Sequence, residues 1–133
     1  MLFKKLYLVT SILIIFSWNK TTGNKGEELA VNYLSDKGYT IIERNWRFRY
    51  AEVDIIAAKN NRLHFFEIKT RTSDKFGKPE ESMSHKKMNM LKTAAEEYQY
   101  QNPQWKYLQF DVLAITIING VPVEYFLIED VYF

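Results

Sequence analysis

Apolar residues recur at helical spacing in two stretches of the chain. The first predicted helix begins near Asn24, which can cap its amino end, and stops at Gly38, which tolerates the left-handed conformation of a helix end. The second follows a predicted loop over residues 73–84 and stops at Asn102-Pro103, because proline cannot continue a helix. The inward faces are formed by Leu29, Ala30, Tyr33 and Leu34 in the first helix and by Met88, Leu91, Ala95 and Tyr98 in the second.

Five stretches rich in β-branched and aromatic residues predict strands. They cover residues 39–49, 51–58, 63–70, 107–118 and 123–128. Asn60-Asn61 and Asn119-Gly120 predict tight turns, because both pairs tolerate the positive φ angles that short hairpins need. The order α-β-β-β-α-β-β predicts an α/β protein whose helices pack against a mixed sheet.

An apolar run precedes this predicted domain. The thirteen residues from Leu6 to Trp18 cover roughly 20 Å as a helix, against about 30 Å of membrane hydrocarbon. Three interpretations stay open: residues 3–18 tether the domain to a membrane, they form an uncleaved signal, or residues 1–20 are an extension that the functional protein does not need. We favour the third, because the remainder indicates a cytoplasmic protein.

Composition limits the chemistry. The 133 residues, 47% of them hydrophobic, suffice for one core, and no linker divides the predicted domain over residues 21–133. The absence of cysteine excludes disulfides, thiolate zinc sites and cysteine nucleophiles. With only two histidines, a hard cation with oxygen ligands is a better expectation than zinc.

The net charge of +2 is distributed unevenly. Residues 59–92 carry nine Lys or Arg against four Asp or Glu, a local charge of +5. Such a segment suits a polyanionic substrate, although a solvated surface of ordinary lysines gives the same count.

Asp54, Glu67 and Lys69 form the strongest candidate for chemistry. Glu67 and Lys69 lie two positions apart on a predicted strand and therefore face the same side, and Asp54 lies on the preceding strand. Two carboxylates and an amine that converge can hold a divalent cation and place a water beside an ammonium group, as phosphodiester cleavage requires. An exposed ion pair between Glu67 and Lys69 would produce the same spacing.

Glu27 shares the inward face of the first helix with three apolar residues. A carboxylate there needs a partner, which Lys69 or a metal-bound water could supply. Asn24 and Glu27 also have the spacing of a capping box, in which the carboxylate serves only the helix end. We predict that Glu27 belongs to the site and retain capping as the alternative.

An ordered set of motifs extends over residues 25–111. It comprises Gly26-Glu27-Glu28-Leu29-Ala30, Gly38-Tyr39, Arg44-Asn45, Glu52-Val53-Asp54, Phe66-Glu67-Ile68-Lys69, Phe76-Gly77 with Pro79, and Lys87. With the order of elements, the set resembles the PD-(D/E)XK superfamily, whose restriction-endonuclease-like fold includes archaeal Holliday-junction resolvases, and within it the bacterial YraN-type family of endonuclease-like proteins. The resemblance implies a three-layer core with a mixed sheet of about five strands flanked by two main helices.

The resemblance also implies roles for individual residues. Asp54 and Glu67 would coordinate Mg²⁺ or Mn²⁺, with a backbone carbonyl and waters completing the shell. Lys69 would orient the attacking water or contact the phosphate. On electrostatic grounds, we expect the substrate to be contacted by Lys87, Arg71 and Arg47.

Together these features predict a metal-dependent nuclease that hydrolyses phosphodiester bonds of DNA in repair or recombination. Nothing in the sequence resembles a helix that reads one base sequence, so we expect selectivity for structure. A junction-cutting enzyme would be expected to pair two sites in a homodimer. The alternative is a nucleic-acid-binding or scaffold protein on a nuclease-like fold that no longer cuts.

Overall fold

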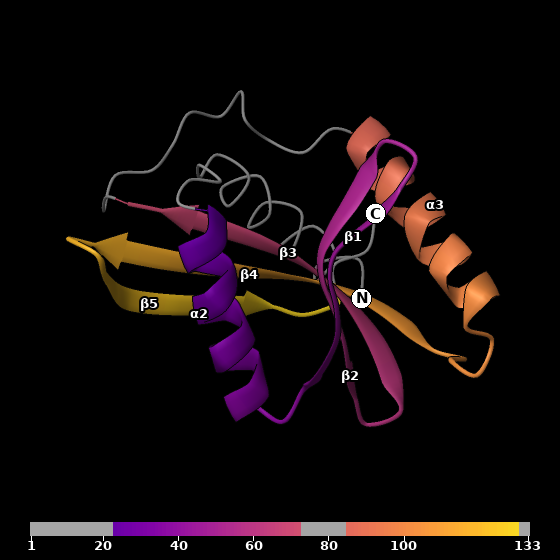
Figure 1. The fold of residues 1–133 in the computed structure, drawn as a ribbon, viewed down its shortest axis with the longest axis horizontal. Helices are drawn as coiled ribbons and strands as arrows, with labels where there is room; N and C mark the ends of the chain where they lie inside the picture. The colour runs from indigo at the N-terminus through magenta and orange to yellow at the C-terminus, as the bar shows by residue number, and fades with distance from the viewer. Residues whose placement is uncertain (1–22, 73–84, 131–133) are drawn as a thin grey trace, which may run out of the picture.

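The computed structural model describes residues 23–72 and 85–130 (Figure 1). Its elements are α2 (Gly23–Asp36), β1 (Thr40–Phe48), β2 (Ala51–Lys59), β3 (Arg62–Arg71), α3 (His85–Gln101), β4 (Leu108–Ile118) and β5 (Val121–Ile128). The predicted order of elements is confirmed. The predicted extension over residues 1–20 and the predicted loop over residues 73–84 lie outside the described residues.

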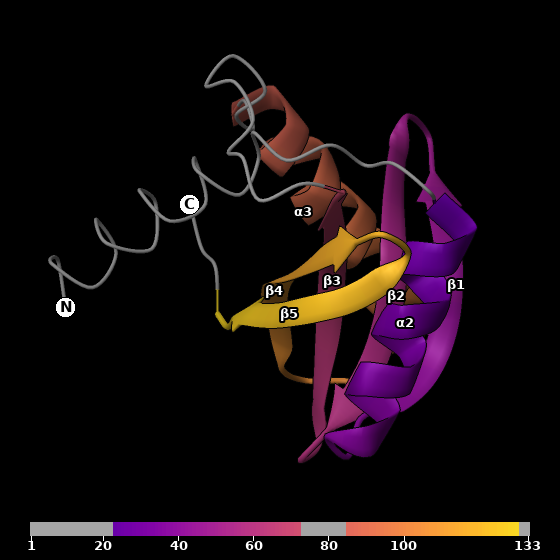
Figure 2. The ribbon, with the colours of Figure 1, turned by 90° about the vertical axis from the view of Figure 1, so that its left-hand side faces the viewer.

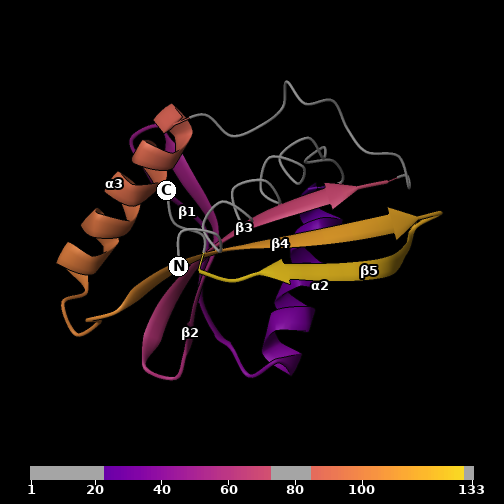
Figure 3. The same ribbon diagram turned by 180° about the vertical axis from the view of Figure 1, so that it is seen from behind.

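The five strands form one mixed sheet. Their order is β1-β2-β3-β4-β5, in which β3 and β4 are parallel and the other neighbours are antiparallel. A parallel pair needs a long crossover connection, and α3 lies within the one that joins β3 to β4. The helix α2 lies in front of β4 and β5 in Figure 1 and behind them in Figure 3, whereas α3 lies beside the β1–β2 hairpin.

The predicted turn chemistry is confirmed. Gly38 has a φ of 95°. Its amide donates to the Ser35 carbonyl over 3.1 Å, and the Tyr39 amide donates to the Leu34 carbonyl over 3.0 Å, which is a Schellman helix end. The two predicted hairpin turns have positive φ at both central residues, namely 52° and 62° at Asn60 and Asn61 and 51° and 77° at Asn119 and Gly120.

Two apolar clusters occupy the two faces of the sheet, with α2 over one and α3 over the other (Figure 2). The first cluster includes Leu34, Ile55, Phe66, Ile68 and Leu113, and the second includes Phe65, Met88, Leu91, Ala95 and Tyr98. Because Ile68 belongs to the cluster under α2, its neighbours Glu67 and Lys69 project toward the α3 face. None of the helices in the described ranges is both long and apolar enough to cross a membrane.

Candidate functional site

The candidate site lies where β2 and β3 stop pairing. The antiparallel ladder between them ends at Ile55 and Phe66. One residue beyond that pair, the Oδ2 atom of Asp54 accepts a hydrogen bond of 2.8 Å from the Ile68 amide. The Asp54 side chain thus binds a backbone amide of β3 beyond the end of the ladder. This hydrogen bond fixes the orientation of the Asp54 carboxylate.

Glu67 and Lys69 form an ion pair on the neighbouring strand. The Nζ atom of Lys69 lies 3.5 Å from Oε1 of Glu67, and their side chains are only 8% and 5% exposed. Asp54 is 1% exposed. The alternative of an exposed surface pair is therefore wrong. Buried charges are costly unless they bind each other or a ligand, so this cluster is not an ordinary feature of a sheet surface.

Glu27 lies beside β1. Its Oε2 atom accepts a hydrogen bond of 3.0 Å from the Asn45 amide group and lies 3.7 Å from the Arg44 guanidinium. Because Trp46 pairs with Val53, and the register continues one residue further, Asn45 stands opposite Asp54. Glu27 therefore reaches the level of Asp54 through β1, but from the face that α2 covers, and its participation in the site stays a prediction.

Asp54 and Glu67 are the carboxylates of the candidate site that are available to a metal ion. Within residues 23–72 and 85–130, no three His, Asp or Glu side chains gather as a metal-binding group. Asp54 and Glu67 could contribute two carboxylates to a divalent ion. Backbone carbonyls and waters would have to complete its shell, which is how Mg²⁺ is commonly held.

The predicted substrate-contacting residues have different surroundings. Arg47 is 76% exposed, and its guanidinium pairs with the Glu52 carboxylate over 2.7 Å. Arg71 ends β3 and is half-buried. Lys87 lies in the first turn of α3, and its side chain is outside the described residues. Of these three residues, Arg71 is the one that lies on the same strand as Lys69, two positions further, and on the same face of that strand.

A buried polar network at the other end of β3 was not predicted. Oδ2 of Asp111 lies 2.6 Å from Nδ1 of His64, and Oδ1 accepts hydrogen bonds of 2.8 Å from the Gln109 side chain and from the Asp130 amide. An ionised carboxylate only accepts, so Nδ1 of His64 donates. The sequence signal was a single aspartate in the largely apolar stretch from Phe110 to Ile117, because a carboxylate in a buried strand requires buried partners.

Tyr39 packs against this network. Its ring meets the His64 ring edge-on at 5.0 Å between centroids. Burial first, and then the negative charges of Asp111 and Glu129, raise the pKa of Tyr39 to about 12. The network links β3 and β4 to the segment that follows β5, and Tyr39, in the connection between α2 and β1, packs against it.

Fold and site define an α/β protein with a buried carboxylate and lysine cluster where two central strands separate. The profile described as "Uncharacterised protein family UPF0102" matches residues 26–115. That span includes Glu27, Asp54, Glu67 and Lys69. The chain belongs to the UPF0102 family.

Proteins of several bacteria are similar to this chain over most of its length. A UPF0102 protein of Syntrophomonas wolfei is 43% identical over 103 residues, which cover 77% of this chain and 90% of the relative. One from Rhodococcus opacus is 42% identical over 77% of this chain and 87% of its own length. One from Flavobacterium psychrophilum is 43% identical over 70% and 78%. The family resemblance predicted from the motifs is confirmed.

Proposed function

We propose that this protein is a metal-dependent nuclease that hydrolyses phosphodiester bonds of DNA and selects its substrate by structure. The observation that most supports the proposal is the burial of Asp54, Glu67 and Lys69 at the point where β2 and β3 separate. Charged groups that are desolvated together are typical of active sites, because chemistry needs them more than stability does.

The donor set fits Mg²⁺ or Mn²⁺. Asp54 and Glu67 would hold the ion, because hard cations take carboxylate oxygens, and the Ile68 carbonyl is a third oxygen on the same strand. When bound, the ion would lower the pKa of a coordinated water and offset the charge that builds on the scissile phosphate.

The chain's own residues supply positioning and charge. The Ile68 amide orients the Asp54 carboxylate, so that this ligand is held before substrate arrives. Lys69 places an ammonium group beside Glu67, where burial reduces screening of its charge toward a phosphate or an attacking water. Arg71, two residues further on the same strand face, is suited to the next phosphate of the backbone.

Cleavage assays test the proposal directly. The full-length protein is incubated with single-stranded, flap, junction and duplex DNA in Mg²⁺ or Mn²⁺, beside Glu67→Gln and a matched control, Glu124→Gln, which changes an exposed glutamate on β5. We expect Glu67→Gln to reduce cleavage by roughly two orders of magnitude or more, as for the loss of one group that stabilises transition-state charge. Cleavage that survives Glu67→Gln would remove this site from the chemistry.

The second candidate is a nucleic-acid-binding protein on the same fold that does not cut. It is favoured by the lack of a group of three metal-binding side chains within the ranges that the structure describes. Salt-dependent DNA binding by a protein that takes up no Mn²⁺ in calorimetry, and cuts none of the substrates, would establish this candidate in place of the first.

A further inference from the structure

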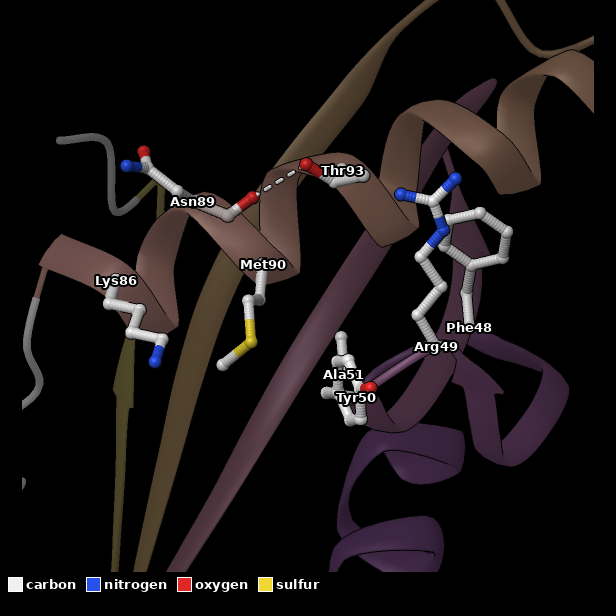
Figure 4. A pocket seen from close by; sticks show the side chains of 8 residues that line it. All are labelled: Phe48, Arg49, Tyr50, Ala51, Lys86, Asn89, Met90 and Thr93. Carbon is white, nitrogen blue, oxygen red and sulfur yellow. Dashed lines mark hydrogen bonds between the residues drawn. The ribbon is translucent and has the colours of Figure 1, made fainter.

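A pocket separate from the carboxylate cluster lies between the β1–β2 turn and the first half of α3 (Figure 4). Its volume is about 530 Å³. The turn contributes Phe48, Arg49 and Tyr50, and the helix contributes Lys86, Asn89 and Thr93. This volume falls in the range of about 300–1,000 Å³ that is typical of sites for small ligands, and it is too small for a duplex.

The lining combines aromatic faces with positive charge. The Arg49 guanidinium lies 5.1 Å from the centroid of the Phe48 ring. Tyr50 is 93% exposed and therefore contributes almost nothing to the apolar core. Lys86 projects from α3 toward the same hollow (Figure 4). The described lining has two cations and no carboxylate, which suits a ligand with a negative charge and a flat ring.

The pocket lies near the candidate site, on the face of the sheet toward which Glu67 and Lys69 project. Ala51 lines it, and Asp54 follows three residues later on β2, which is about 10 Å along an extended strand. That distance is about three nucleotide steps at the B-form rise of about 3.4 Å. Ala51 also belongs to the apolar cluster under α3, and Glu67 and Lys69 project toward that face.

We propose that this pocket binds one unpaired nucleotide of the nucleic-acid substrate, with its base stacked on Tyr50 and the phosphates on its two sides near Arg49 and Lys86, which lie toward opposite ends of the pocket (Figure 4). The inference rests on the proposed function, which makes the ligand a nucleic acid, and it names the substrate class: a duplex next to a single-stranded segment. A base offers a flat face for Tyr50 and polar edges for Asn89, whatever its sequence.

Binding of the full-length protein to labelled nucleic acids tests this inference. Fluorescence anisotropy in EDTA, where no metal supports cutting, compares a blunt DNA duplex with the same duplex carrying a short single-stranded tail. Tyr50→Ala is compared with Tyr100→Ala, which removes a tyrosine that is 81% exposed at the far end of α3. Lys86→Gln is compared with Lys106→Gln, which removes an exposed lysine beyond α3. Tails of RNA in place of DNA show which of the two nucleic acids the pocket prefers.

We expect Tyr50→Ala to weaken binding of the tailed duplex by about fivefold or more, the lower end of what one base stacked on an aromatic ring contributes. Binding of the blunt duplex should not change, and Tyr100→Ala should change neither. Lys86→Gln should reduce the salt dependence of tailed-duplex binding by about 0.7 in the slope of log K, and Lys106→Gln should not. Tyr50 is so exposed that its truncation does not threaten folding, which circular dichroism verifies.

The outcomes separate this inference from the proposed function. Equal effects of Tyr50→Ala on tailed and blunt duplexes, or no effect on either, overturn the pocket even if the protein cuts DNA. A preference for the tailed duplex that depends on Tyr50 supports nucleotide binding in the pocket, whether or not the wild-type protein cuts DNA. Failure of the wild-type protein to cut in Mg²⁺ would contradict only the nuclease proposal.

Discussion

Gly26 is held against β3 so tightly that no other residue fits without movement. A Cβ atom added to Gly26 would lie 2.6 Å from the Cγ2 methyl group of Thr70, far inside van der Waals contact. The next nearest atoms of Thr70 are its Cβ at 3.7 Å and its Oγ1 at 3.8 Å, which are ordinary contacts. The obstacle to Gly26→Ala is therefore one methyl group, and Thr70→Ser removes that methyl group while keeping the hydroxyl.

Two effects of opposite sign decide the stability of Gly26→Ala. Alanine stabilises a helix relative to glycine by up to about 1 kcal/mol. Overpacking against Thr70 costs about 1–3 kcal/mol, because either α2 or the end of β3 must shift. We therefore expect a net loss of up to about 2 kcal/mol with Thr70 present, and a gain of up to about 1 kcal/mol in the Thr70→Ser background.

Urea unfolding of all four proteins, followed by tryptophan fluorescence, measures this change of sign. The coupling between the two substitutions should be about 1–3 kcal/mol in favour of the double variant. If Gly26→Ala has the same effect in both backgrounds within about 0.5 kcal/mol, the contact between α2 and Thr70 does not explain why glycine occupies this position.

Two further predictions concern the buried network. Asp111→Ala removes the acceptor of three hydrogen bonds and should lower the free energy of unfolding by about 3–5 kcal/mol. Asp111→Asn keeps one acceptor oxygen and should lower it by roughly 1–2 kcal/mol. Equal losses of the two variants in urea unfolding would contradict this account. The pKa of Tyr39 is about 12 in the folded protein and 10.0 in the unfolded chain. The contribution of Tyr39 to the free energy of unfolding should therefore be fully present below pH 10. It should fall by roughly 2 kcal/mol as pH rises to about 12, because the unfolded chain loses its proton first. Tyr39→Phe should make the decline between these pH values shallower, with Tyr100→Phe as the control, and an unchanged slope in Tyr39→Phe would show that other groups cause it.

Local chemistry explains why so much of the fold could be predicted. Gly38, Asn60-Asn61 and Asn119-Gly120 each require positive φ angles that few residue types tolerate, so these positions fix where a helix ends and where hairpins turn. The inward residues of α3 could be named because helical periodicity alone determines which side chains share a face, and Met88, Leu91, Ala95 and Tyr98 are all buried.

Contacts between distant residues could not be predicted in the same way. His64 and Asp111 are 47 positions apart, and only the parallel register of β3 and β4 brings them together. The sequence showed Gly26 as the first residue of a motif, but the reason for a glycine lies in Thr70 on another element. The pocket beside Tyr50 also depends on how α3 lies against the β1–β2 turn, which no local pattern determines.

The candidate site occupies the part of β3 that is held by three different neighbours. At one end His64 is bound to Asp111 of β4, and at the other Thr70 is pressed against α2 at Gly26. Between them the ladder to β2 has ended, and the Ile68 amide is bound by the Asp54 side chain. A strand that is fixed at both ends while one edge is opened can carry Glu67 and Lys69 in a defined position without the neighbouring strand in the way. Such preorganisation is what metal binding and phosphate chemistry require of a site, because groups that must first be ordered lose much of their effect.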